Sequence, residues 1–259
     1  MRTSFAIARL LALVVICIAV TGCDSFNRAV KPKAARTSAF LSHGKDLRAD
    51  PHSPFSLNWT NSSRSVQSAA RQRNEIWIAP VSLQYLRPIS KLASKVESND
   101  AAQKAGARQL AALMHTEFVD AFRKSPHSRY RLANRPNSKA VVLELALVEL
   151  NPNSISAGMF RTALNVAAVP WTDALVGRSF KGTIAIEGKL RDYPTKNTLL
   201  EFADNEESKS TFLLSFRDFT RYGQAQQAIG EWAAQFEQLT RTPPNGKVNA
   251  APQFTILPW

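Results

Sequence analysis

The sequence is poor in cysteine, with two Cys among its 259 residues. Disulfide scaffolds, zinc fingers and iron–sulfur proteins all need more cysteine than this, so these classes are excluded. Acidic residues are also scarce, because 20 Asp and Glu stand against 33 Lys and Arg, which makes the formal net charge +13. Hydrophobic residues make up 44% of the chain, which is too many for a disordered protein. They are spread too thinly for a protein with several membrane spans.

Residues 1–22 have the pattern of a lipoprotein signal peptide. Arg2 and Arg9 form a basic start without any acid, and an unbroken apolar run follows at residues 10–20. This run is too short to span a hydrocarbon core, which takes about 20 residues, but it fits the centre of a secretory signal. The run ends in VTGC at residues 20–23, which resembles the bacterial lipobox and makes Cys23 the predicted lipidation site. The alternative is an uncleaved signal anchor.

Processing at Cys23 removes every free thiol, because Cys17 leaves with the signal and Cys23 becomes a thioether. The sequence therefore predicts neither a cysteine nucleophile nor a thiolate metal site. We expect a cell-envelope protein anchored on the periplasmic side of a membrane by its N-terminal lipid. The choice between inner and outer membrane stays open, although Asp24 resembles an inner-membrane retention signal of enterobacterial lipoproteins.

Residues 23–73 are predicted to be a basic tether followed by irregular coil. Six basic and two acidic residues lie between residues 24 and 48, and residues 50–73 are rich in Ser, Asn and Pro. The tether has two interpretations, a contact with anionic lipid or a plain solvated linker. Ordered structure is expected to start near Glu75.

Two segments have the periodicity of amphipathic helices. Apolar residues recur every four positions in residues 99–124, at Leu110, Met114, Phe118 and Phe122. Residues 223–240 carry a second apolar stripe that includes Trp232. Both segments are therefore predicted to pack one helical face against a core.

Five segments have the short apolar pattern of β-strands: residues 75–81, 128–133, 141–150, 183–192 and 200–202. The strand at 141–150 is apolar on both faces, which is typical of a central strand. The strand at 183–192 alternates apolar and polar residues, which predicts one buried and one solvated face.

These elements predict an α+β fold, with a small mixed or antiparallel sheet and two main helices on one face. The expected order is β-α-β-β-insert-β-β-α, after the signal peptide and flexible tether. The domain is expected at residues 74–241, and residues 242–259 form a C-terminal tail.

Several segments resemble a family of bacterial lipoproteins catalogued as domain of unknown function 3313. The resemblance covers residues 38–241 and implies a lipid-anchored envelope domain without an assigned activity or known catalytic residues. It is carried by AFLS at residues 39–42, the strand at 76–81, ELALVELNP at 144–152, GTIAIEG at 182–188 and the helix around Trp232.

Motifs for catalysis and for metal binding are absent from the sequence. No two histidines have the i, i+4 spacing of a helical metal site, and no serine-nucleophile motif or Gly-rich phosphate loop occurs. Glu144 and Glu149 differ in parity along their strand, so we expect them on opposite faces of the sheet. Glu144 is the carboxylate to check for catalysis, and the simpler interpretation is a pairing with a neighbouring arginine. We expect no enzyme, no metal and no cofactor.

A basic block without acidic residues is the first candidate interaction surface. The block has two interpretations. It is either a docking site, for anionic lipid, a cell-wall polymer or an acidic protein, or it is a solvated helix end and strand edge. Nucleic acid is not an expected partner, because export separates the chain from it and no binding motif occurs. The block consists of Arg123, Lys124, Arg129, Arg131, Arg135 and Lys139.

An apolar insert at residues 155–176 is the second candidate surface. Its large side chains include Phe160, Val169 and Trp171, which exceed what a plain loop needs. Either the insert covers the sheet, the favoured interpretation, or it meets the bilayer or a partner. Together these features predict a non-catalytic scaffold or accessory subunit of an envelope complex. The alternative is a hydrolase-like envelope enzyme with an unrecognised site.

Overall fold

The computed structural model describes residues 36–88, 100–151, 183–207, 223–243 and 245–250. Six strands form one sheet in the order β1-β6-β5-β4-β2-β3. The elements are β1 (Leu57–Thr60), α2 (Arg64–Arg71), β2 (Glu75–Ile78), α4 (Asp100–Lys124), β3 (Arg131–Leu132), β4 (Ala140–Asn151), β5 (Thr183–Asp192), β6 (Thr198–Glu207) and α7 (Gly223–Arg241).

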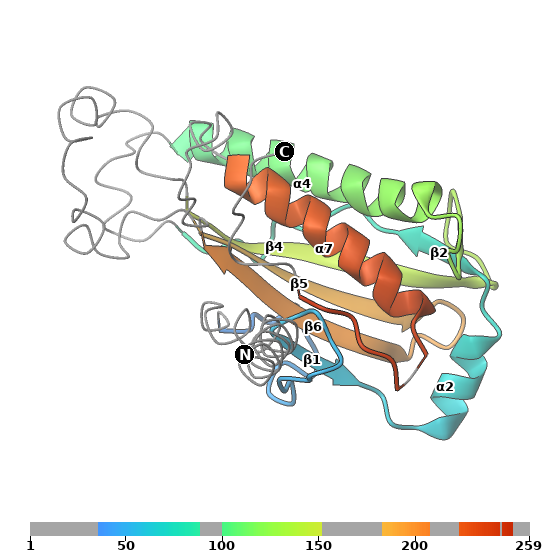
Figure 1. The fold of residues 1–259 in the computed structure, drawn as a ribbon. Coiled ribbons are helices and arrows are strands. Elements are labelled where there is room, and N and C mark those ends of the chain that lie inside the picture. The colour runs from blue at the N-terminus through green and yellow to red at the C-terminus, as the bar shows by residue number, and fades with distance from the viewer. Residues whose placement is uncertain (1–35, 89–99, 152–182, 208–222, 244, 251–259) are drawn as a thin grey trace, which may run out of the picture.

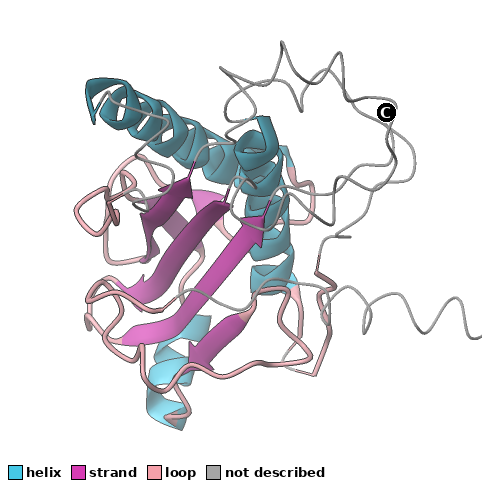
Figure 2. Cartoon of the chain, turned by 90° about the vertical axis from the view of Figure 1, so that its left-hand side faces the viewer, coloured by secondary structure: helices cyan, strands magenta, loops and turns pink. Residues whose placement is uncertain are grey.

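The sheet is mixed. β1, β6, β5 and β4 pair antiparallel in that order, whereas β2 pairs parallel with both β4 and β3. α4 and α7 pack against each other across one face of the sheet (Figures 1 and 2). The predicted α+β fold with two main helices on one face is therefore confirmed.

The main core lies between this face and the two helices. The four α4 residues that recur at helical spacing are all buried there, together with Trp232 of α7. They pack against alternate side chains of β4, such as Leu143 and Leu145. Full burial of a large apolar side chain contributes about 1.5–3 kcal/mol, so this stripe holds the helices to the sheet.

An aromatic cluster joins the N-terminal part of the chain to this core. The ring of Phe55 stacks on that of Phe202 in β6 at 4.1 Å, and the ring of Phe236 in α7 lies 5.5 Å from Phe202. Phe202 faces Gly188 of β5 across the ladder. The glycine leaves room for the ring, because any side chain at residue 188 would occupy the same space.

The irregular coil expected at residues 50–73 is wrong, because β1 and α2 lie within it. β1 exists through its pairing with β6, and Ala70 is the one buried residue of α2. Such short elements take most of their stability from tertiary contacts, so their own sequences carry little signal. Ordered structure also begins before Glu75, since Phe40 is already buried.

The remaining strand predictions differ in length rather than in place. The strand expected at residues 128–133 is reduced to Arg131–Leu132, whereas β6 runs beyond the expected 200–202 to Thr198–Glu207. Part of the predicted tail packs on the domain, because the Val248 side chain is buried and its N–H donates to the His52 carbonyl over 3.1 Å.

The opposite face of the sheet is covered by residues 37–48, a segment that we call the strap. Three apolar side chains of the strap pack against small side chains of β4, β5 and β6, and this makes a second core. The solvated face expected for the strand at 183–192 is therefore wrong, because the strap covers it. The residues of this core include Phe40, Leu41, Leu47, Ala146, Val148, Ala185 and Ala203.

Candidate functional site

An open groove of about 810 Å³ lies where the C-terminal end of α7 meets α2 and the β1–β6 side of the sheet. Leucines of β5, β6 and α7 form its apolar lining: Leu190, Leu199, Leu200 and Leu239. Three arginines also line it: Arg71 of α2, Arg129 of the loop after α4, and Arg241 of α7. We call this feature the arginine groove.

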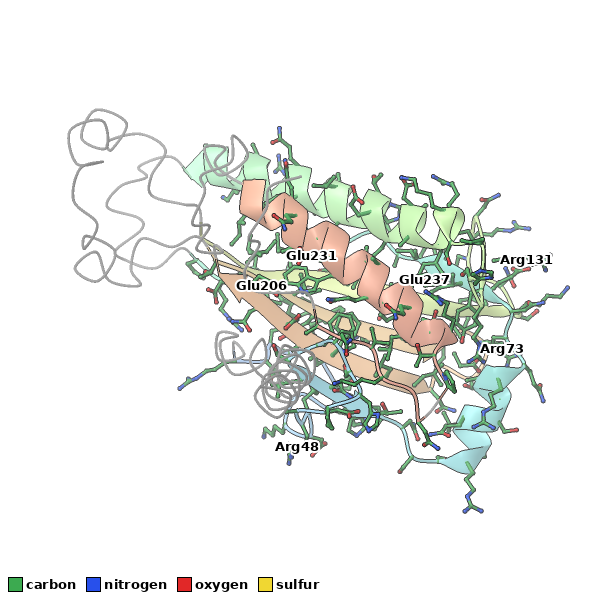
Figure 3. All side chains as sticks on the ribbon, viewed as in Figure 1. Arg48, Arg73, Arg131, Glu206, Glu231 and Glu237 are labelled. Carbon is green, nitrogen blue, oxygen red and sulfur yellow. The ribbon has the colours of Figure 1, made fainter. Side chains whose placement is uncertain are left out.

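Hydrogen bonds from two places hold α2 in position beside the groove. Nε of Arg73 donates to Oδ1 of the buried Asp192 at 2.6 Å, so the end of α2 is tied to the end of β5. The N–H of Asn61 donates to the Leu199 carbonyl over 2.9 Å. Figure 3 shows Arg73 and Glu237 toward the end of the molecule where α2 lies.

The Asp192 carboxylate is suited to this structural role. Burial by itself raises the pKa of Asp192, but hydrogen bonds from Arg73 and Thr195 outweigh it and hold the pKa below its ordinary value. A carboxylate whose pKa is lowered on folding contributes stability above its unfolded pKa and loses it as the pH falls. The wall of the groove is thus held by an ionised Asp192 at neutral pH.

The three arginines differ in their surroundings. Nε of Arg241 lies 3.1 Å from Oε2 of Glu237, which partly neutralises it. The guanidinium of Arg129 lies over the Tyr130 ring at 5.1 Å, and within the described residues neither Arg129 nor Arg71 has an acidic partner. Both side chains are exposed, so two positive charges at the groove are accessible to a ligand.

One polar atom at the groove lacks a partner. Oδ1 of Asn58 is buried and accepts no hydrogen bond within the described part of the chain, while its Nδ2 donates to Oδ2 of Asp50 at 3.4 Å. A buried acceptor without a donor costs about 1–3 kcal/mol. The atom is covered by protein, so this cost belongs to the packing of β1 and not to a ligand contact.

Only Arg129 of the predicted basic block reaches the arginine groove. Arg123 and Lys124 pair with Asp120 on the same helix, at 2.6 and 2.9 Å. Nη2 of Arg131 lies 3.6 Å from Oε1 of Glu75. The remaining two members, Arg135 and Lys139, are exposed. A docking role for the block stays a prediction.

The other predicted site residues lie outside the described residues. These are the lipidation site Cys23 and the members of the apolar insert, Phe160, Val169 and Trp171. Their roles stay predictions. No helix in the described ranges is long and apolar enough to cross a bilayer. Those ranges also contain no group of three or more His, Cys, Asp or Glu that would suit a metal ion.

Two buried glutamates beneath the strap were not anticipated. Glu187 accepts hydrogen bonds from the N–H of Ser38 at 2.6 Å and from its hydroxyl at 2.5 Å. Glu201 accepts the N–H groups of Ser42 and His43 at 3.0 and 2.7 Å. The strap is therefore fixed to the sheet by carboxylates as well as by apolar contacts. The alternating strand pattern assigned Glu187 to a solvated face, and only the strap's position buries it.

The expected separation of Glu144 and Glu149 is also wrong. A bulge in β4 between Leu147 and Glu149 shifts the register by one residue, so both carboxylates lie on the strap face. Glu144 pairs with Arg191 and with Nζ of Lys189, the latter at 3.4 Å. This pairing with a neighbouring arginine is the interpretation that the sequence favoured.

Glu187 makes the strap sensitive to pH. Burial raises the pKa of Glu187, and the hydrogen bonds from Ser38 oppose this only in part. Stability linked to a raised pKa is fully present below the unfolded pKa and is lost as the pH rises through the folded pKa. Wild type is therefore expected to gain stability relative to Glu187→Gln as the pH falls from about 7 toward the ordinary value of 4.5.

Urea unfolding of both proteins across this range measures the difference. Glutamine is a suitable replacement, because its carbonyl can accept the Ser38 N–H and its amide can donate to the Ser38 hydroxyl. A stability difference that does not change with pH, or that changes in the opposite direction, would contradict the assignment.

The fold and the site define an α+β domain with a strapped mixed sheet and a ligand-sized groove at its edge. The chain belongs to the family described as "Protein of unknown function (DUF3313)", which it matches over residues 36–236. No curated protein matches it.

Among solved structures, the chain is similar to two dodecamers of PelC from Paraburkholderia phytofirmans. One, of a PelC variant in space group C2, has 9% identity and a TM-score of 0.32, and the match covers 64% of this chain and 88% of that one. The other, in space group P6, has 11% identity and a TM-score of 0.34, and the match covers 63% of this chain and 89% of that one.

Proposed function

We propose that this protein is a lipid-anchored, non-catalytic scaffold or accessory subunit of a bacterial envelope complex. The observation that carries the proposal is the strap. It lies at the start of the described residues, within the segment that was predicted to be a tether, and its backbone is held by the buried carboxylates of Glu187 and Glu201. A lipid on Cys23 would therefore tether the sheet to the membrane through the strap. This arrangement suits a subunit that positions a partner at the membrane.

The chemistry of the arginine groove supports binding rather than hydrolysis. Asp50, His52 and Ser53 all line it, and they are the residue types of a hydrolase triad. Asp50 contacts the main chain of the histidine, because its Oδ1 accepts the backbone N–H of His52 at 2.8 Å. Nδ1 of His52 faces the Gly246 carbonyl at 3.3 Å, and Oγ of Ser53 accepts the Phe55 N–H at 3.3 Å. These contacts stabilise a turn.

The anchor is tested by Cys23→Ala. Several acyl chains bind a membrane stably because each buried CH₂ contributes about 0.8 kcal/mol, so their loss should release the chain from membranes or stop its processing. Fractionation of cells with immunoblotting of the membrane and soluble fractions measures this. Cys17→Ala is the matched control and should leave the distribution unchanged. Membrane association of Cys23→Ala equal to wild type would refute the lipid anchor.

The subunit role is tested by crosslinking intact envelopes and purifying the full chain through a tag. One partner should be recovered in an amount comparable to that of the tagged protein. Purification of that partner should in turn recover this protein. Recovery of the protein alone, at every crosslinker length tried, would refute the role in a complex.

A further inference from the structure

We infer that the arginine groove binds an acidic peptide segment of the partner protein, with carboxylates on its arginines and apolar side chains on its leucines. This inference rests on the proposed function and adds the chemistry of the partner. It uses three features of the groove: its charge, its mixed apolar and polar lining, and its size.

Charge complementarity selects an anionic ligand. Three arginines and one acidic residue, Asp50, line the groove, and Arg71 and Arg129 have no acidic partner within the described residues. The two come from α2 and from the loop after α4, so an occupant of the groove would meet both. An arginine and a carboxylate form charge-assisted hydrogen bonds, often in a bidentate geometry.

The rest of the lining selects a peptide over a lipid. The groove is lined by polar side chains as well as leucines, among them Thr60, Gln67 and Thr240, and peptide N–H and C=O groups can pair with these whereas an acyl chain cannot. The leucines fit apolar side chains, but the groove is open and also lined by Thr60 and Gln67, which suits a polar backbone better than a hydrocarbon chain. Its volume of about 810 Å³ lies in the range of sites for drug-sized ligands, which suits a few residues of a partner chain.

The test is peptide display against the full chain in detergent micelles. A library of random hexapeptides should yield sequences that combine Asp or Glu with Leu, Ile or Phe. The most enriched peptide, labelled with fluorescein, is then measured by fluorescence polarisation. We expect Arg71→Glu/Arg129→Glu to bind it at least about tenfold more weakly than wild type.

The matched control is Arg123→Glu/Arg131→Glu, which reverses two exposed arginines of the basic block that do not line the groove. It should change the affinity by less than about twofold. The neutral pair Arg71→Gln/Arg129→Gln should show a smaller loss than the charge reversal. If the charge reversal lowers the melting temperature of the protein, the glutamine pair replaces it as the test variant.

Four outcomes overturn the inference: no enriched peptide, enrichment of basic peptides, equal losses in the groove and control variants, or stronger binding to phosphatidylglycerol vesicles than to any acidic peptide. Its failure is distinguishable from failure of the proposed function. If display yields no acidic peptide while envelope crosslinking still returns one reciprocal partner, the subunit role stands and the groove is not its docking site. If crosslinking returns no partner, the subunit role fails whatever the groove binds.

Discussion

Replacing Asp204 by alanine is expected to destabilise the protein by about 3–5 kcal/mol. Asp204 is 2% exposed and joins three parts of the chain. Its Oδ1 accepts the N–H of Ser56 at 3.1 Å and the Ser56 hydroxyl, and its Oδ2 accepts Nε1–H of Trp232 at 2.8 Å. Alanine would leave the buried indole N–H of Trp232 and the half-buried N–H and hydroxyl of Ser56 without this acceptor.

Urea unfolding of wild type and Asp204→Ala measures the loss, and a melting temperature should fall by about 2–4 °C for each kcal/mol. The matched control is Asp46→Ala, because Asp46 is exposed, and its change should stay within about 0.5 kcal/mol. Trp232→Phe removes one donor and keeps the aromatic packing, so it should cost about 1–2 kcal/mol. An Asp204→Ala protein as stable as Asp46→Ala would show that the carboxylate does not join these elements.

Gly188→Ala is expected to cost about 2–3 kcal/mol by overpacking the aromatic cluster. A Cβ at residue 188 would lie 2.1 Å from Cζ of Phe202. The ring cannot turn away freely, because Phe55 stacks on it at 4.1 Å and Phe202 itself is fully buried. Either the ring moves and disrupts the stack, or the two strands separate. Urea unfolding is again the measurement.

The matched control is Gly230→Ala in α7, where the nearest atom to the added Cβ is Oε2 of Glu117 at 4.0 Å. Alanine is the better helix former, so this change should stabilise the protein by up to about 1 kcal/mol. Phe202→Leu should relieve the crowding, so Gly188→Ala/Phe202→Leu should lose less stability than the two single losses added together. Additive losses would show that the ring and the new Cβ do not meet.

Local patterns predicted the helices and the central strands well. The helix expected at residues 99–124 is α4 at Asp100–Lys124, and the one expected at 223–240 is α7 at Gly223–Arg241. Both carry a long apolar stripe, and such periodicity reports one buried face whatever covers it. The apolar strand expected at 141–150 is likewise β4.

The same reasoning failed where burial depends on a distant segment. Glu187 sits in an alternating strand that indicates a solvated face, and only the strap buries it, 149 residues away in sequence at Ser38. The bulge in β4 has no local signal and reverses the expected face of Glu149. The arginine groove draws on residues from Asp50 to Gly246, and among them the sequence pattern indicated Arg129 alone.

Local patterns were enough to predict the long elements, the fold class and the family, and they also predict a signal peptide and a lipidation site, which stay predictions. The strap, its buried glutamates and the groove came from the packing of distant segments. A carboxylate is stable in a core only when hydrogen-bond donors from another segment reach it. The arginines form a site only when the helices and the loop that carry them come together. Both conditions depend on which segments pack together, which no local pattern records.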